Sequence, residues 1–310
     1  MNVPSEKLAY LLTEQLNPHT ENIDLLSSRD IVDLMHAEDY NAFQAVDSEL
    51  DSIATAVDLI VDAFQNNGRL IYVGAGTSGR LGVLDAAECP PTFSSHPEMV
   101  QGIIAGGWEA LRRSIENAED SAENGAQAIH EKDVGPLDVV AGIAASSTTP
   151  YVVHAIKEAH RLGAKTVFIT CNPGTPIEEA DVQITLLVGP EVVAGSTRLK
   201  AGTATKLVLN MLTTASMIRI GKVYRNLMVD LNATCNKLIE RSRRIIQGFA
   251  HLTPEETDTL LEKAHGNVKT ALIMHFRGIS REEALDLLAE HQGRIQDIIP
   301  REQMEFTDPV

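Results

Sequence analysis

Three short stretches rich in Ser and Thr have the composition of an anion-binding site. Residues 74–79 (GAGTSG) carry the hydroxyls of Thr77 and Ser78, and similar clusters occupy residues 144–150 and 195–200. Hydroxyls and the backbone amides at a helix start donate hydrogen bonds to phosphate without a positive charge. Each stretch alone could equally be a cap for the helix that follows it. The candidate binding residues are Gly76, Thr77, Ser78, Ser146, Ser147, Thr148, Ser196, Thr197, Arg198 and Lys200.

The first stretch also matches the G-x-G-x-x-G pattern of dinucleotide-binding folds. In those folds an acidic residue near the end of the second strand binds the ribose. Here the second candidate strand, residues 101–105, is followed by Gly106 and Gly107. Thr77 and Ser78 favour a compact phosphomonoester instead, so we expect no dinucleotide cofactor. The ten His and three Cys residues show no spacing typical of a metal site.

Two glutamates are candidates for acid–base chemistry beside such a site. Glu88 precedes Cys89-Pro90-Pro91, where we expect the helix to end, because the residue before a proline disfavours helical geometry. Glu119 lies in an acidic run at residues 116–123. On composition alone, both would be interpreted as solvated surface carboxylates.

The elements that would position these residues alternate between strands and helices. Five β-rich runs predict buried strands at residues 70–73, 101–105, 137–143, 166–170 and 182–188. Apolar periodicity predicts helices at residues 43–64, 81–88, 108–127, 151–162 and 199–220. This order predicts an α/β fold with a doubly wound, five-stranded parallel sheet flanked by helices. The hydroxyl stretches follow the first, third and fifth strands, so we expect them in one crevice at the carboxyl ends of the strands.

The strand pattern stops after Gly221. Residues 222–310 are predicted to be helical only, with helix starts at Thr253 and Ser280 and a small three-helix module from Pro254 to Ile298. We therefore expect three parts. These are an N-terminal helical segment at residues 1–59, a sheet domain at 60–223 and a C-terminal helical region at 224–310.

Composition and charge exclude several classes of partner. The 310 residues include 26 Lys and Arg and 43 Asp and Glu, a net charge of −17, so nucleic acid and anionic membranes are not expected to bind. No secretory signal is visible, and no apolar run approaches the ~20 residues that cross a bilayer. Cys89, Cys171 and Cys235 are widely spaced, which fits a reducing compartment. We expect a cytoplasmic protein whose ligand is a small molecule.

The three stretches belong to longer motifs that extend from about Thr13 to the C-terminal module. These motifs occupy residues 74–82, 85–92, 118–121, 144–150, 171–174, 195–203 and 226–230. They resemble the sugar isomerase (SIS) domain, which binds phosphosugars, and more specifically the N-acetylmuramic acid 6-phosphate etherase family. One departure is Asn117, where related sequences commonly have Gly.

The resemblance implies a reaction and a role for each glutamate. The family cleaves the lactyl ether of N-acetylmuramic acid 6-phosphate during cell-wall recycling, giving N-acetylglucosamine 6-phosphate and D-lactate without a metal or redox cofactor. Glu88 would be the acid toward lactate and Glu119 the base at C2. The family is similar to a homodimer-forming group, and the aliphatic helix at residues 199–220 has more apolar surface than one sheet face covers, so we expect a homodimer.

Other functions on the same fold stay open. A phosphosugar isomerase or deaminase would use the same hydroxyl loops and a base. It would not need a partner for the lactyl carboxylate, for which Arg198 and Lys200 are candidates. A non-catalytic phosphosugar-binding regulator, similar to the glucokinase regulator, would keep the loops and could lose Glu88 and Glu119. The C-terminal module resembles the ubiquitin-associated three-helix type, which by itself implies no ubiquitin.

Overall fold

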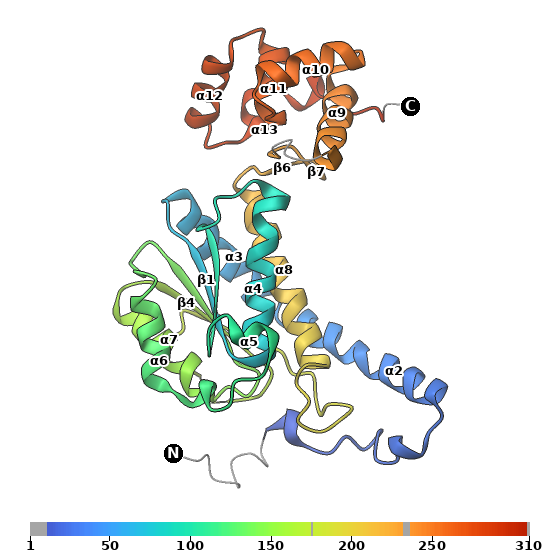
Figure 1. Ribbon diagram of the computed structural model, residues 1–310, viewed down its shortest axis with the longest axis vertical. Helices are drawn as coiled ribbons and strands as arrows, with labels where there is room; N and C mark the ends of the chain where they lie inside the picture. The colour runs from blue at the N-terminus through green and yellow to red at the C-terminus, as the bar shows by residue number, and fades with distance from the viewer. Residues whose placement is uncertain (1–10, 175, 232–235, 309–310) are drawn as a thin grey trace. The chain divides into compact units, whose positions relative to one another are not determined.

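The computed structural model describes residues 11–174, 176–231 and 236–308 (Figure 1). Its contacts divide the chain into two units. The sheet unit extends to Ala87 and resumes from Glu98 to Thr213, whereas the helical unit contains Glu88–Pro97 and the chain from Thr214 onward. Cys235 lies outside the described residues.

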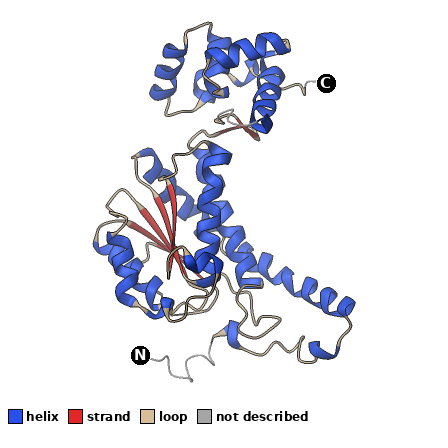
Figure 2. Ribbon diagram, viewed as in Figure 1, coloured by secondary structure: helices blue, strands red, loops and turns tan. Residues whose placement is uncertain are grey.

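The sheet unit is built on one parallel sheet with the strand order β2-β1-β3-β4-β5 (Figure 2). Its strands are β1 (Leu70–Gly74), β2 (Val100–Ile104), β3 (Val139–Ile143), β4 (Lys165–Thr170) and β5 (Val182–Thr185). In register, Leu70 of β1 pairs with Val100 on one side and Val139 on the other. The central strands β1 and β3 are buried along their whole length, as expected for Val- and Ile-rich strands covered on both faces. The predicted five-stranded parallel α/β fold is confirmed.

Helices cover both faces of this sheet (Figure 1). On one face α7 (Pro150–Arg161) packs on β1, β3 and β4, with α6 (Ala122–His130) beside it. The other face carries α3 (Leu50–Gln65), α4 (Gly76–Phe93) and α8 (Lys200–Arg219). Successive side chains of β1 point to the two faces in turn. Ile71 and Val73 belong to the apolar cluster around α7, while the Tyr72 hydroxyl donates a hydrogen bond to Asp85 of α4 at 3.0 Å.

The strand order creates a switch point between β1 and β3. From β1 the chain crosses to the edge strand β2 and then returns past β1 to form β3. The connections that leave β1 and β3 therefore run toward opposite sides of the sheet. In open α/β sheets, ligands bind in the crevice at the carboxyl ends of the strands at such a point.

Two predicted helices are interrupted by local turns. The helix expected over residues 43–64 is instead α2 (Ser28–Asp47) followed by α3, with a break at Ser48 and Glu49. The helix expected over residues 108–127 is divided into α5 (Glu109–Arg112), η3 (Ala118–Asp120) and α6.

Asn117 explains the second interruption. Its φ of 60° is left-handed, which no α-helix can include. Gly adopts this conformation freely, and Asn is one of the few other residues that tolerate it. The turn before Glu119 therefore accommodates Asn117 in a left-handed conformation.

Helix α4 continues through Pro90 and Pro91, so the expectation that it ends at Glu88 is wrong. Each proline removes an amide donor from the helix. The helical turn nevertheless persists, because the Ser94 N–H donates to the Pro90 carbonyl at 2.9 Å. Glu88 consequently lies inside the helix, more than one turn before Phe93.

The helical unit contains a short hairpin that we did not expect from the sequence. It consists of β6 (Val223–Tyr224) and β7 (Leu227–Met228), which pair antiparallel. The helices that follow are α9 (Asn236–Ala250), α10 (Pro254–Lys263), α11 (Val268–Arg277), α12 (Arg281–Glu290) and α13 (Ile295–Ile298). Thr253 and Ser280 start α10 and α12 as predicted, each with a complete capping box. Across the described ranges, no helix has both the length and the apolar character needed to cross a bilayer.

Candidate functional site

One pocket of the sheet unit joins residues from all three hydroxyl stretches. It has a volume of about 340 Å³ and lies at the ends of β1 and β3, so we call it the switch-point pocket. The hydroxyl stretches contribute Ala75, Gly76, Thr77, Ser78, Ala144, Ala145, Ser146, Thr148, Thr149, Pro150, Gly195 and Thr197. The remaining lining residues are Leu11, Thr13, Glu14, Glu119, Asp120 and Ile143.

Glycines bring the first stretch close to the strand ends. Gly76 has a φ of +52°, a left-handed conformation in which other residues are strained. A Cβ atom on Gly79 would lie 2.7 Å from the Gly74 carbonyl oxygen, so the end of β1 and the first turn of α4 are too close for a side chain. This turn carries Thr77 and Ser78, both half-buried, into the pocket.

The second stretch forms a cluster of hydroxyls before α7. The Oγ atom of Ser146 lies 3.3 Å from Oγ1 of Thr149, and the Thr148 N–H donates to Ser146 Oγ at 3.4 Å. Such long hydrogen bonds are weak, so these groups can exchange them for a bond to a phosphate oxygen. Ser147 is placed differently. Its φ is 63°, and its Oγ lies 2.6 Å from the position that a Cβ on Gly174 would take, so this side chain is not among the lining residues.

The third stretch contributes Thr197 and the backbone of Gly195, but not the start of α8. The first amides of α8, at Lys200 and Ala201, each donate a 3.0 Å hydrogen bond to the carboxylate of Glu191. Glu191 is fully buried. Burial raises its pKa, although the two amide bonds and nearby Lys200 act in the opposite direction. This carboxylate already occupies the α8 N-terminus, so the hydroxyl of Thr197 is the donor left for a ligand.

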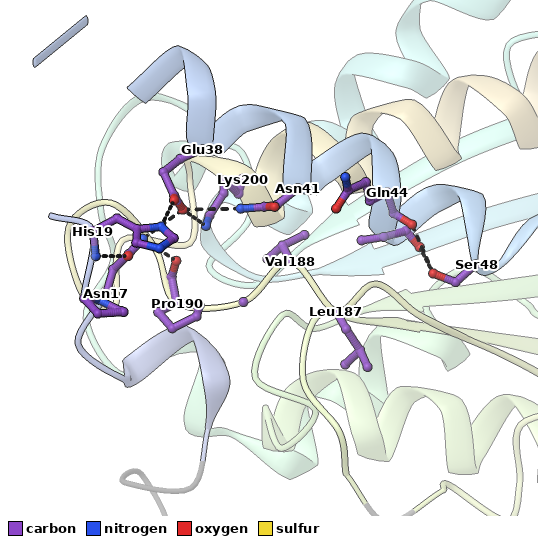
Figure 3. Close-up of a pocket in the computed structure, with 13 residues that line it drawn as sticks. Asn17, His19, Glu38, Asn41, Gln44, Ser48, Leu187, Val188, Pro190 and Lys200 are labelled. Carbon is purple, nitrogen blue, oxygen red and sulfur yellow. Dashed lines mark hydrogen bonds and ion pairs between the residues drawn. The ribbon is translucent and has the colours of Figure 1, made fainter. Parts of the chain in front are cut away.

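Lys200 forms a buried ion pair and does not line the switch-point pocket. Its side chain is 1% exposed, and Nζ lies 2.6 Å from Oε2 of Glu38 on α2. Figure 3 shows this pair beside a second pocket of about 420 Å³, with His19 and Asn17 also bonded to Glu38. Burial alone would raise the pKa of Glu38, but hydrogen bonds from Lys200, His19 and Asn17 lower it to about 2. Arg198 and Ser196 do not line the switch-point pocket, and Arg198 is exposed.

Carboxylates, and no cations, face the switch-point pocket. Glu119 and Asp120 approach it from η3, and Glu14 lies in the N-terminal segment, in η1 (Leu12–Glu14). Among the described residues that line this pocket, none is Lys, Arg or His. An anion bound here would be held by hydroxyls and backbone amides.

Glu88 lies on the exposed surface of α4 and is not one of the described residues that line the pocket. One turn earlier, Asp85 is buried and accepts hydrogen bonds from Tyr72, Asn210 (2.7 Å) and Thr213 (3.3 Å). Burial raises the pKa of Asp85, while these three bonds oppose the rise. They hold this part of α4 against β1 and α8.

Sequence reasoning missed the N-terminal wall of the pocket. Thr13 is buried, and its backbone carbonyl accepts a 2.8 Å hydrogen bond from Gly195, 182 residues later. Thr13 is also bonded to Asn172. No local pattern predicts such a long-range contact, and Glu14 reads as one more acid in a polar segment.

The chain is similar to enzymes along nearly its whole length. It is 51% identical over 292 residues to the N-acetylmuramic acid 6-phosphate etherase of a Picosynechococcus species, covering 94% of this chain and 97% of that protein. It is 52% identical over 287 residues to the N-acetylmuramic acid 6-phosphate etherase 2 of Vibrio cholerae, covering 92% and 94%.

Family models and a solved structure match the sheet-containing part. The model of the glucokinase regulatory protein N-terminal SIS domain matches residues 52–160, and that of the SIS domain matches residues 114–215. The solved phosphoheptose isomerase of Francisella tularensis is 16% identical, with a TM-score of 0.47, over 61% of this chain and 100% of that one. Because of the extent and identity of its match to the curated relatives, this chain belongs to the N-acetylmuramic acid 6-phosphate etherase family.

Proposed function

We propose that this enzyme cleaves the D-lactyl ether of N-acetylmuramic acid 6-phosphate, giving N-acetylglucosamine 6-phosphate and D-lactate. The observation that supports this most is the switch-point pocket, where three hydroxyl stretches meet the carboxylate of Glu119. Relatives about half identical to the chain carry the name of this activity. The reaction would take place during cell-wall recycling.

The phosphate would be held by neutral donors. Thr77 and Ser78 lie in the first turn of α4, Ser146 and Thr148 precede α7, and Thr197 precedes α8. Hydroxyl hydrogen bonds to a charged acceptor are stronger than those between neutral groups. Several of them therefore offset the repulsion expected from an acidic protein with a net charge of −17. The lactyl carboxylate needs a cation. Lys200 is already paired, so we assign Arg198, which is exposed next to the lining residue Thr197 but does not itself line the pocket.

An elimination explains why two carboxylates are needed. The ether at C3 is not activated for direct hydrolysis. In the open-chain sugar, the C1 aldehyde acidifies the proton on C2, and Glu119 would remove it. Breaking the C3–O bond expels lactate as an acid protonates the departing oxygen. Water then adds to C3 of the unsaturated aldehyde while C2 regains a proton, so the net reaction is hydrolysis. We assign the acid to Glu88, on the surface of α4, and the base to Glu119, which lines the pocket.

We further propose that the enzyme works as a homodimer. Helix α2 leaves Val32 (59%), Tyr40 (58%) and Phe43 (51%) exposed, and α8 leaves Met211 37% exposed. Exposed apolar side chains in this number are usually covered by a partner. Glu88 is not among the described residues that line the pocket of its own chain. In a homodimer, it could act in the pocket of the partner instead.

The compartment and the domain functions are also proposals. Cys171 is a buried thiol, and burial raises its pKa to about 12. Free thiols of this kind suit a cytoplasmic enzyme. We assign phosphosugar binding to residues 60–223 and completion of the pocket wall to residues 1–59, and we regard residues 224–310 as a separate helical module.

The direct test is release of D-lactate from N-acetylmuramic acid 6-phosphate by the purified full chain. N-acetylmuramic acid without phosphate is the control, because it lacks the group that the hydroxyls hold. We expect lactate and N-acetylglucosamine 6-phosphate in equal amounts from the phosphorylated sugar and little lactate from the control. Binding without lactate release would favour a phosphosugar-binding regulator, and isomerisation of the sugar would favour an isomerase.

A further inference from the structure

We propose that Asn172 is a positioning residue that builds one wall of the switch-point pocket by joining the N-terminal segment to the Ser146 stretch. As far as it concerns substrate binding, this inference rests on the proposed function. Asn172 follows β4, does not line the pocket, and is fully buried. Its role is therefore to hold other groups in place.

Both donors and the acceptor oxygen of the Asn172 side-chain amide are hydrogen-bonded. Its Nδ2 donates to the Thr13 hydroxyl at 2.9 Å and to the Ala145 carbonyl at 2.7 Å, while its Oδ1 accepts from the Thr13 N–H at 3.3 Å. Ala145 immediately precedes Ser146, the central hydroxyl of the second stretch. One buried amide thus connects two walls that lie 132 residues apart in the sequence.

Thr13 in turn contacts the third stretch. Its carbonyl accepts the hydrogen bond from Gly195. The next residue, Glu14, lies over the same glycine, because a Cβ on Gly195 would be 2.8 Å from Glu14 Oε2. Asn172 therefore also determines where a third carboxylate faces the pocket, as a potential acceptor for hydroxyl or amide groups of a sugar.

The residues after Asn172 support the same loop from behind. Gly174 leaves room for the Ser147 side chain, whose backbone is left-handed. A non-glycine residue in that conformation is strained and persists only when its surroundings hold it. The turn at residues 171–174 thus contacts the second stretch at three points: the Cys171 N–H and the Asn172 side chain both donate to the Ala145 carbonyl, and Gly174 lies beside Ser147.

The test compares three variants of the full chain. Asn172→Ala removes all three side-chain hydrogen bonds of the connection and leaves the backbone bond from Cys171 to Ala145 in place. Thr13→Val removes only the hydroxyl that accepts from Nδ2. The matched control is Thr166→Val, because Thr166 is fully buried at the opposite end of β4 and its hydroxyl bonds Asp181 at 3.1 Å and the Glu179 carbonyl. All three lose buried hydrogen bonds near one strand, so a general loss of stability affects each of them.

Two readouts separate positioning from stability. Hydrogen–deuterium exchange should accelerate at residues 11–20 and 193–199 in Asn172→Ala, less so in Thr13→Val, and not in Thr166→Val. The KM for lactate release should rise on the order of 10-fold in Asn172→Ala with a smaller change in kcat, because Glu119 is not held by this connection. If Asn172→Ala does not fold, Thr13→Val carries the test.

The proposal is overturned if exchange at these residues and KM stay parental in both pocket variants, or if Thr166→Val changes them equally. A parent enzyme that releases no lactate would instead refute the proposed function. The exchange comparison does not need substrate, so it would still decide the role of Asn172.

Discussion

At the scale of single residues, the pocket depends on hydroxyls rather than cations. Three carboxylates, Glu14, Glu119 and Asp120, line it together with Ser and Thr side chains. A phosphate bound there would gain hydrogen bonds, but no ion pair, from the described lining residues. The loss of one hydroxyl should weaken phosphate binding, because no lysine or arginine among the described lining residues can compensate.

Ser78→Ala and Ser146→Ala should each weaken the binding of inorganic phosphate and of substrate. A hydrogen bond to a charged group contributes roughly 1.5–3 kcal/mol, so we expect a loss of about 10- to 100-fold. Calorimetric titration with phosphate measures it. Ser48→Ala is the control, because Ser48 is exposed at the end of α2 and bonds to the Gln44 carbonyl. Parental affinity in both pocket variants would refute the phosphate assignment.

The two glutamates can be separated by isotope exchange. Glu88→Gln cannot supply a proton, so lactate release should fall by a factor on the order of 10²–10⁴. Its Glu119 could still remove the C2 proton and return a deuteron from deuterium oxide. Glu119→Gln should neither release lactate nor exchange. Proton NMR of the reaction mixture measures both the lactate released and the deuterium at C2 of the recovered substrate. If only Glu119→Gln exchanged the C2 proton, the roles of the two glutamates would be the opposite of those assigned.

The sequence predicted those site residues that follow a strand end, because parallel strands bring their ends together. The predicted residues that line the pocket are Gly76, Thr77, Ser78, Glu119, Ser146, Thr148 and Thr197. Within a loop, however, composition does not say which way a side chain points. Ser147 turns away through a left-handed backbone, and Lys200 pairs with Glu38, a residue 162 positions earlier.

At the scale of elements, regular periodicity predicted the sheet and its flanking helices, and single residues decided where they break. Asn117 interrupts one helix through its positive φ. Pro90 and Pro91 do not interrupt another, in which the Ser94 N–H still donates to the Pro90 carbonyl although two amide donors are missing. The hairpin β6–β7 has strands of two residues each, which is too short for any period to be visible.

The buried ion pair between α2 and α8 should make stability depend on pH. The pKa of Glu38 is about 2 in the folded chain, against 4.5 when unfolded. Such a lowered pKa stabilises the fold fully above pH 4.5, and the contribution is lost as pH falls toward 2. At about 1.36 kcal/mol per pH unit, it amounts to roughly 3 kcal/mol.

Glu38→Gln removes the titrating group. At pH 6, the free energy of unfolding of this variant, measured in urea, should be lower than that of the parent by about 3 kcal/mol or more. The substitution also leaves Lys200 buried without its counter-ion. At pH 3, about one pH unit above the folded pKa of about 2, the difference should shrink to about 1.4 kcal/mol. Asp33→Asn is the control, because Asp33 pairs with Arg29 on the exposed face of α2. An equal difference at both pH values would contradict the assignment.

At the scale of the whole molecule, the proposed homodimer would cover the exposed apolar side chains of α2. Light scattering at micromolar concentration should give twice the chain mass of 33.7 kDa. Tyr40→Glu and Phe43→Glu would place charge among the exposed apolar side chains of α2, and together they should shift the mass toward one chain. A parent mass near 33.7 kDa would refute the homodimer.

Mixed dimers can show whether the two glutamates of one site come from different subunits. Glu88 does not line the pocket that contains Glu119 of the same chain, so we expect Glu88 to act in the pocket of the partner. Glu88→Gln and Glu119→Gln subunits, each inactive alone, would then form one intact site per mixed dimer. After random exchange of equal amounts, about half of the dimers are mixed and have one working site, so activity should return to about a quarter of the parental value. If both glutamates act within one chain, every site in the mixture lacks one of them, and lactate release stays at the level of the separate variants.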